Sequence, residues 1–314
     1  MKKVILAADL GGTNLRMAAV GDDGEILSRS RTSTPRTSKR IVEELINATI
    51  ECRRELSGCE FGPVSLAIPA TVDTQKGAII EAPNLSELNG LVLSAELGDK
   101  LGAEVLLEND ANAAALGENW LGASKDFENS IMVTLGTGVG GGIIIDGNIL
   151  RGIDGTAGEI GHITLEPNGH GCGCGGNGCL EQYASATAVI RMANEIAELK
   201  PKSKLAESEQ LTSKRVYELG KSGDRDSKEI FRKQGFYLGL GLSGLINALN
   251  PEVIVFGGGA SAGWDLFKPE MVKQIEKRSY LTPAERVKLI RSRLGDDAGI
   301  LGAAHLGFEK KISK

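Results

Sequence analysis

Two stretches of this sequence share one pattern, and that pattern decides the fold. ADLGGTNLRMAAVGDDGEIL runs from Ala8 to Leu27, and VTLGTGVGGGIIIDGNIL runs from Val133 to Leu150. Each places a Leu-Gly turn between apolar strands and ends in Asp-Gly-x-Ile-Leu. Two unrelated hairpins can share such turns, because glycine turns are common in hairpins. Since turn, strand and second turn recur in the same order, we favour an internal duplication that presents one glycine-rich turn from each half to a common cleft.

The segments around the two stretches alternate between strand and helix patterns. Strands are expected over 4–10, 15–20, 25–33, 64–70, 103–109 and 252–259. Helices are expected over 38–56, 110–122, 186–199, 213–220 and 226–249 and near the C-terminus, with an exposed loop over 200–210. This alternation predicts an α/β fold. We expect an N-terminal domain over 1–115 and a larger C-terminal domain over 116–314, whose last helix can pack back on the first domain.

The composition describes a globular chain long enough for two domains, with 314 residues of which 41% are hydrophobic and 25% charged. Its net charge of −5 offers no basic surface for nucleic acid or anionic membranes. The N-terminal apolar run breaks at Asp9, too early for a signal peptide, and no later run reaches the ~18 apolar residues of a membrane span. The odd number of cysteines, five, disfavours a secreted disulfide framework. We therefore expect a cytoplasmic protein without nucleic-acid or membrane partners.

Three glycine-rich turns indicate a site for phosphate groups. DLGGTN, LGTGVGG and FGGGAS all follow expected strands, and glycine leaves backbone N–H groups unobstructed by β-carbons. None fits the P-loop or the dinucleotide-binding pattern, so each alone is a weak signal. Together they predict a three-part nucleotide cradle. Asp9, just before the first turn, is placed to hold Mg²⁺ directly or through water, although it can also simply cap the turn.

The stretch LLENDANAAALGE places polar residues where an expected strand meets an expected helix. Side chains at such junctions project into the clefts of α/β proteins. Asn and Asp are also preferred helix caps, so capping alone explains one of Asn109 and Asp110. The pair suggests more, because Asn109 can orient a hydroxyl while Asp110 accepts its proton. A carboxylate in that role suits in-line phosphoryl transfer.

The segment HGCGCGGNGCLE, residues 170–181, carries three of the five cysteines. Their C-x-C-x4-C spacing supplies three thiolates, and a tetrahedral zinc needs a fourth ligand. His162 and His170 are both candidates by spacing, whereas His305 lies in a late apolar helix. A redox loop is the weaker alternative, because cysteines so close form strained disulfides and a cytoplasm keeps them reduced. Four protein ligands leave no position for a reactive water, so such a zinc would be structural.

In this order, the motifs resemble those of the ROK family of sugar kinases and repressors, most closely its bacterial glucokinases. The motifs are DLGGTN, ENDANAAALGE, LGTGVGGG, AGEIGHI, CGCGGNGCLEQYAS and NPEVIVFGGG, and the likeness covers nearly the whole chain. The resemblance implies a duplicated two-domain α/β fold of the actin-like, hexokinase-like and ribonuclease H-like type, with an interdomain cleft. It also implies a homodimer or homotetramer.

The resemblance further assigns roles to residues. ATP phosphates would lie on Gly11, Gly12 and Thr13 of the first turn and on Gly136, Thr137 and Gly138 of the second, with adenosine near Gly257, Gly258 and Gly259. Asp110 would be the catalytic base, and the sugar hydroxyls would be held by Asn109, Asp110, Glu159, His162 and Glu181. The family pattern assigns the fourth zinc ligand to His162, beside Cys172, Cys174 and Cys179. Mg²⁺ would accompany ATP.

These implications predict an ATP-dependent kinase that phosphorylates the 6-hydroxyl of glucose. Fructose, mannose, allose, N-acetylglucosamine and N-acetylmannosamine are alternative substrates, because they offer many of the same hydroxyls. A sugar-sensing repressor is the alternative outside enzymes. Such repressors carry a helix-turn-helix before the first phosphate turn, whereas here Asp9 follows Met1 by eight positions. We therefore expect the enzyme.

Overall fold

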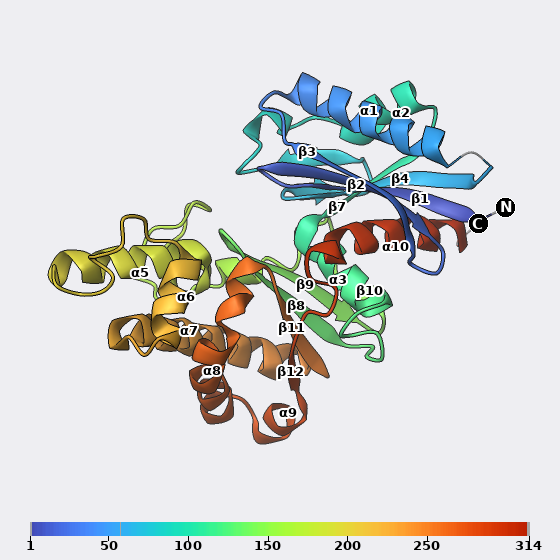
Figure 1. Ribbon diagram of the computed structural model, residues 1–314. Helices are drawn as coiled ribbons and strands as arrows, with labels where there is room; N and C mark the ends of the chain where they lie inside the picture. Colours follow the sequence, from blue (N-terminus) through green and yellow to red (C-terminus); the bar gives the residue numbers. More distant parts are fainter. Residues whose placement is uncertain (1, 57, 313–314) are drawn as a thin grey trace. The chain divides into compact units, whose positions relative to one another are not determined.

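The computed structural model describes residues 2–56 and 58–312 (Figure 1). The chain divides into two compact units, one of residues 1–128, 142–158 and 293–314 and one of residues 129–141 and 159–292. This division differs from a single boundary at residue 115, which would cut a helix in two. The chain also returns to the first unit twice, and its last helix belongs there.

Two five-stranded sheets repeat one topology. The first has the order β3-β2-β1-β4-β7, and the second has the order β10-β9-β8-β11-β12. The strands of the first are β1 (Lys3–Leu10), β2 (Asn14–Gly21), β3 (Ile26–Ser33), β4 (Glu60–Ile68) and β7 (Val105–Asn109). Those of the second are β8 (Ser130–Leu135), β9 (Val139–Ile145), β10 (Asn148–Ile149), β11 (Val253–Gly257) and β12 (Lys288–Arg291). A separate hairpin pairs β5 (Thr71–Asp73) with β6 (Ala78–Glu81). Because each large sheet orders its strands third, second, first, fourth, fifth, the expected duplication is confirmed.

The expected helices form close to their predicted bounds. They are α1 (Ser38–Glu55), α3 (Asp110–Trp120), α5 (Ala186–Leu199), α6 (Ser213–Lys221), α7 (Arg225–Leu249) and α10 (Ala298–Ile312). The sequence did not predict α2 (Leu93–Leu101), α4 (Glu181–Ala184), α8 (Trp264–Arg278) and α9 (Leu281–Arg286). Pro269 lies inside α8, and an internal proline ordinarily indicates a helix end. None of the described helices has both the length and the apolar character required to cross a bilayer.

Strand β1 is buried on both faces, and its side chains alternate between two cores. The even-numbered residues from Val4 to Leu10 pack in a cluster with residues of α1 and α2. Ile5 and Ala7 pack instead with residues of α10 and with Ala113 of α3. Figure 1 shows α1 and α2 over one face of this sheet and α10 over the other. The period-two alternation of a strand therefore places the C-terminal helix against the N-terminal sheet.

Glycines allow α3 and α10 to meet backbone to backbone. A β-carbon on Gly302 of α10 would lie 1.6 Å from the carbonyl oxygen of Ala113, and one on Gly117 of α3 would lie 2.2 Å from that of Ala298. Small residues at a helix crossing let the two backbones approach closely. This contact holds the helix that begins at Asp110.

A buried carboxylate anchors the point where the chain returns to the first unit. The Glu118 side chain, in the last turns of α3, has no exposed surface. It accepts hydrogen bonds from the backbone N–H groups of Arg293 (3.0 Å) and Leu294 (2.9 Å) and of Ala123 (2.6 Å). A buried carboxylate is stable when several backbone amides donate to it. Glu118 thus connects α3 to the segment that leads into α10.

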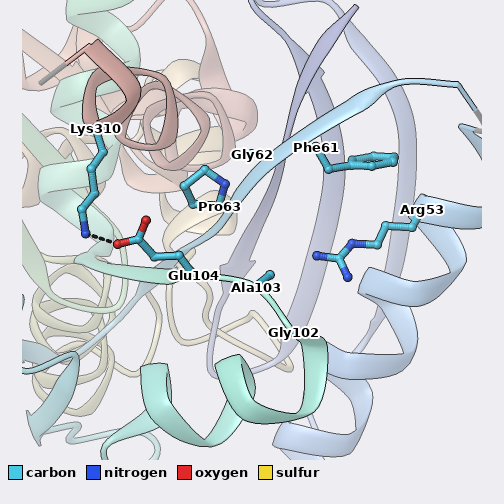
Figure 2. Close-up of a pocket in the computed structure, with 8 residues that line it drawn as sticks. All are labelled: Arg53, Phe61, Gly62, Pro63, Gly102, Ala103, Glu104 and Lys310. Atoms are coloured by element: carbon cyan, nitrogen blue, oxygen red, sulfur yellow. Dashed lines mark hydrogen bonds and ion pairs between the residues drawn. The ribbon is translucent and has the colours of Figure 1, made fainter. Parts of the chain in front are cut away.

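A surface hollow of about 540 Å³ lies at the amino ends of β4 and β7, away from the ends that carry Ile68 and Asn109 (Figure 2). The pairing of β1 with β4 is irregular there, beside Gly62 and Pro63, because proline cannot donate to a sheet. The hollow is lined by Arg53, Phe61, Gly62, Pro63, Gly102, Ala103, Glu104 and Lys310. Figure 2 shows Lys310 paired with Glu104 at its margin. This hollow is therefore distinct from the strand ends that carry the predicted chemistry.

We expect Gly302→Ala to destabilise the protein, because its methyl group would overlap the Ala113 carbonyl. Overpacking of this kind costs about 1–3 kcal/mol or more. Gly244→Ala is the matched control, since Gly244 is an exposed glycine of α7 whose β-carbon would meet nothing within 4 Å. Alanine there should stabilise the helix by about 0.5–1 kcal/mol. Denaturant unfolding measures both changes, and equal stability of the two variants would contradict the close α3–α10 contact.

Candidate functional site

The junction of β7 and α3 presents Asn109 and Asp110 in different roles. The Asn109 side-chain oxygen accepts from the N–H groups of Ala111 (2.9 Å) and Asn112 (3.1 Å), so Asn109 is the helix cap. Its amide nitrogen donates to the Ala70 carbonyl at 3.2 Å. Asp110 is the first residue of the helix, and one of its oxygens accepts from the N–H of Ala111 at 2.9 Å. Capping therefore accounts for Asn109, and Asp110 follows it as the first residue of the helix.

A buried ion pair supports this junction, and the sequence did not single it out as a pair. Glu108 is 1% exposed, and its carboxylate accepts from Arg151 Nε at 2.8 Å. The other oxygen accepts from the Asn112 side chain (3.0 Å) and from the N–H of Asn109 (3.1 Å). Arg151 lies in the segment after β10, more than 40 residues along the chain, so no local pattern connects it with Glu108. The pair joins that segment to the residues beside Asp110.

The first glycine turn connects β1 to β2. The Gly11 amide donates to the Asn14 carbonyl at 2.8 Å, and the Gly11 carbonyl accepts from the Thr34 hydroxyl at 2.6 Å. Gly12 and Thr13 are exposed. Gly11 therefore shapes the turn, and the exposed tip consists of Gly12 and Thr13.

Asp9 precedes this turn and is bound to a cation of its own chain. Its side chain is nearly buried and forms an ion pair with Arg16, whose Nη1 donates to the Asp296 carbonyl at 2.8 Å. Burial raises the pKa of Asp9, while the Arg16 guanidinium opposes that rise. The predicted Mg²⁺ site thus already contains a positive charge beside the carboxylate.

The second glycine turn connects β8 to β9 and is tied to the start of α5. The Gly136 carbonyl accepts from the N–H of Ala186 at 2.8 Å, and the Thr137 carbonyl accepts from the Thr187 hydroxyl at 2.8 Å. Gly136 also donates to the Gly138 carbonyl at 3.0 Å. Thr137 is exposed at the tip of the turn. These contacts hold the turn in a single conformation beside a helix N-terminus.

The glycines after β11 serve different purposes. A β-carbon on Gly257 would lie 2.5 Å from the Met132 side chain, and one on Gly258 would lie 2.4 Å from the Leu135 carbonyl. Gly258 also has a φ of +80°, which disfavours other residues. A β-carbon on Gly259 would meet nothing within 4 Å. Packing therefore explains Gly257 and Gly258, and only Gly259 faces open space.

Gly259 lines a largely apolar cavity of about 250 Å³ in the second unit. The other lining residues come from α5, α6, α7 and the 3-10 turn Gly259–Gly263, and they are Val189, Ser213, Lys214, Tyr217, Glu218, Phe231, Ala260, Ala262 and Gly263. The Tyr217 and Phe231 rings pack edge to face, with centroids 6.0 Å apart. Of these lining residues, only Gly259 was predicted from the sequence, because most of the others are scattered over three helices and form no motif.

His162, Cys172, Cys174 and Cys179 converge on one point, and we name them the His/Cys₃ cluster. Their ligand atoms all lie within 4.8 Å of one another. His162 Nδ1 is 3.5 Å from Cys172 Sγ, and Cys174 Sγ is 3.6 Å from Cys179 Sγ. Tetrahedral bonds of about 2.0–2.1 Å to nitrogen and about 2.3 Å to sulfur require separations of about 3.5–3.8 Å. These two separations match the tetrahedral values, so the cluster is compatible with zinc. The exposed His170 lies outside it against Tyr183.

Two carboxylates lie beside the His/Cys₃ cluster. His162 Nε2, the nitrogen that does not face the cysteines, is 4.0 Å from a Glu159 oxygen. Partial burial raises the pKa of Glu159, His162 opposes the rise, and the charge of Glu181 adds to it. Glu181 begins α4, and its Oε1 is 3.9 Å from Cys172 Sγ. The second unit thus brings the three residues Glu159, His162 and Glu181 together.

The chain is similar to known proteins along nearly its whole length. A family described as the ROK family matches residues 5–310. The chain is 37% identical to a glucokinase of Thermotoga maritima over 317 residues, covering 98% of each. Among solved structures, a ROK family glucokinase of Streptomyces griseus in complex with glucose and AMPPNP is 32% identical with a TM-score of 0.82, covering 98% of this chain and 99% of that one.

A ROK family transcriptional regulator, described as a homologue of an E. coli protein, is 27% identical with a TM-score of 0.90. The match covers 98% of this chain and 78% of the regulator's chain. The expected fold class, two duplicated α/β halves of the actin-like and hexokinase-like type, is confirmed.

We expect Arg151→Met to destabilise the protein, because it leaves the buried Glu108 carboxylate without its cation. An unsatisfied buried group costs about 1–3 kcal/mol, and a charged one more. Adding Glu108→Gln should recover most of the loss. Arg215→Met is the control, since it removes an exposed pair with Glu218 worth at most about 1 kcal/mol. Thermal unfolding of the four proteins checks this, and equal effects of the two arginine substitutions would contradict it.

We expect the purified protein to hold one zinc per chain and Cys174→Ser to lose it, because serine does not replace a thiolate ligand. The variant should also unfold at a lower temperature, since metal binding stabilises the folded loop. Cys59→Ser, outside the cluster, should retain zinc. Elemental analysis by mass spectrometry measures the metal content. Full zinc content in the Cys174 variant would remove that residue from the ligand set.

Proposed function

The chain belongs to the ROK family, and from that premise we propose that it transfers the γ-phosphoryl group of ATP to the 6-hydroxyl of glucose. The observation that carries the proposal is the 37% identity to a glucokinase over nearly the full length of both chains. The chain also has a carboxylate, that of Asp110, at the β7–α3 junction. Glucose is the proposed acceptor because that relative and the Streptomyces griseus protein are both named glucokinases.

In the proposed reaction, Asp110 is the general base. It accepts the proton of the 6-hydroxyl as that oxygen attacks the γ-phosphorus and the bond to the β-phosphate oxygen breaks, with ADP leaving. What supports this role is its place: Asn109 supplies the cap, so Asp110 is not required for capping. The Glu108–Arg151 pair holds the backbone that carries both residues. Phosphoryl transfer depends mainly on positioning and charge stabilisation, which a supported junction provides.

We propose that the sugar hydroxyls are held by Asn109, Asp110, Glu159, His162 and Glu181. The carboxylates are acceptors, and His162 can offer Nε2 because Nδ1 faces the cysteines. The four ligands of the His/Cys₃ cluster would close the coordination shell of a bound zinc, which would make that zinc structural. It would orient the His162 ring and fold a glycine-rich segment that contains little else to pack.

We propose that nucleotide binds along the glycine turns. The exposure of Gly12, Thr13 and Thr137 supports this proposal, because an exposed turn is open to phosphates. The cavity beside Gly259 is apolar and contains aromatic rings, which suits the adenine and ribose. Asp9 would contact Mg²⁺ through water, since Arg16 already occupies one of its oxygens. A homodimer or homotetramer belongs to the same proposal and comes from the family resemblance alone.

The test is ADP formation from Mg-ATP with glucose beside fructose, mannose, allose and the N-acetylhexosamines. We expect the highest kcat/KM on glucose. Preference for another sugar would keep the kinase and replace its acceptor. Sugar binding without turnover on any of them would overturn the kinase in favour of a sensor.

We expect Asp110→Asn to lower kcat by about 10²–10⁴, the usual contribution of a general base. Sugar affinity, measured by calorimetry, should change little because the amide keeps the shape of the side chain. Asp126→Asn makes the same change at an exposed turn residue and should leave kcat unchanged. A near-normal rate in the Asp110 variant would exclude it as the base.

A further inference from the structure

The second glycine turn contains two glycines whose surroundings differ sharply. A β-carbon on Gly136 would meet nothing within 4 Å. A β-carbon on Gly138 would lie 2.1 Å from Glu181 Oε2 and 3.1 Å from its carboxyl carbon. Neither glycine has a positive φ, so backbone conformation requires glycine at neither position. A side chain at position 138 would therefore occupy the space that the Glu181 carboxylate fills.

The turn also fixes the carboxylate that it accommodates. Glu181 Oε2 accepts a hydrogen bond of 3.0 Å from the N–H of Val139, the residue that follows Gly138. Glu181 Oε1 faces the other way, 3.9 Å from Cys172 Sγ of the His/Cys₃ cluster. One half-buried side chain therefore connects the second glycine turn with the cysteine-rich segment, and both of its oxygens have assigned neighbours.

We propose that Gly138 is a positioning residue for the sugar, acting through Glu181, and that Gly136 and Thr137 form the part of the turn that faces nucleotide. The inference rests on the proposed function, in which Glu181 holds a sugar hydroxyl. It revises the expectation that every glycine of the turn serves the close approach of phosphate. In this proposal a residue of the second glycine turn sets sugar affinity, so the same turn affects the binding of both substrates.

Two alanine substitutions in one turn separate these roles. The neighbour of a β-carbon at position 138 is the far end of a flexible side chain, so Gly138→Ala can fold by displacing the Glu181 carboxylate. We expect it to weaken glucose binding, measured by calorimetry without nucleotide, roughly ten- to a hundredfold, as for a lost hydrogen bond to a charged group. Gly136→Ala has room to fold and should leave glucose binding within about twofold while raising the KM for ATP.

A double-mutant cycle shows whether Gly138 acts through Glu181. Glu181→Ala removes the carboxylate, so adding Gly138→Ala in that background should cost no further sugar affinity. The melting temperature provides a second readout that does not depend on function. Gly138→Ala should lower it in the wild-type background and leave it unchanged when residue 181 is alanine.

The outcomes distinguish the positioning role of Gly138 from the proposed function of the whole protein. If Gly138→Ala weakens glucose binding equally in both backgrounds, or raises only the KM for ATP, the positioning role is overturned. If the wild-type protein binds no sugar at all, the proposed function fails. The melting-temperature cycle then still decides whether Gly138 accommodates Glu181, and additive losses would overturn that contact as well.

Discussion

The backbone contact between α3 and α10 is the constraint on which the first unit depends. At Gly302 and Gly117 no β-carbon would fit between the two helices. The opposite face of α10 covers β1 and β4. Because α3 begins at Asp110, the position of that carboxylate relative to its sheet is set by a helix near the other end of the sequence. Glu118 reinforces the arrangement by binding the amides of Arg293 and Leu294, where the chain enters this helix region.

The candidate residues are held by supports that are mostly buried and charged. Glu108 is paired with Arg151 behind Asn109 and Asp110, and Asp9 is paired with Arg16 behind the first glycine turn. Uncompensated buried carboxylates would be costly, so each support constrains the geometry as well as the charge. Fixed supports of this kind suit a reaction that depends on positioning.

The second unit organises its residues around the cysteine-rich segment. The His/Cys₃ cluster turns one nitrogen of His162 inward and the other toward Glu159. Glu181 extends from the same segment to the amide of Val139. The residues of this unit that we propose for metal, sugar and nucleotide are therefore neighbours along one continuous set of contacts. The glycines of this unit illustrate the consequence, because Gly138 makes room for a carboxylate, Gly258 for a carbonyl, and Gly259 for a cavity.

Features that depend on local pattern could be predicted from the sequence alone. Strand and helix periodicity located most of the elements, the repeated Leu-Gly turn revealed the duplication, and the order of the motifs identified the family. Helix α8 was not predicted, because Pro269 interrupts the helical pattern of its sequence. The tertiary structure was needed to show that Asn109 rather than Asp110 caps α3 and which atoms each glycine admits. The spacing left His162 and His170 open, the family resemblance assigned His162, and the structure brings His162 to the cysteines. The physical reason is that space and hydrogen-bond partners come from residues far away in the chain, such as Arg151 for Glu108 and Glu181 for Gly138, and no local spacing encodes them.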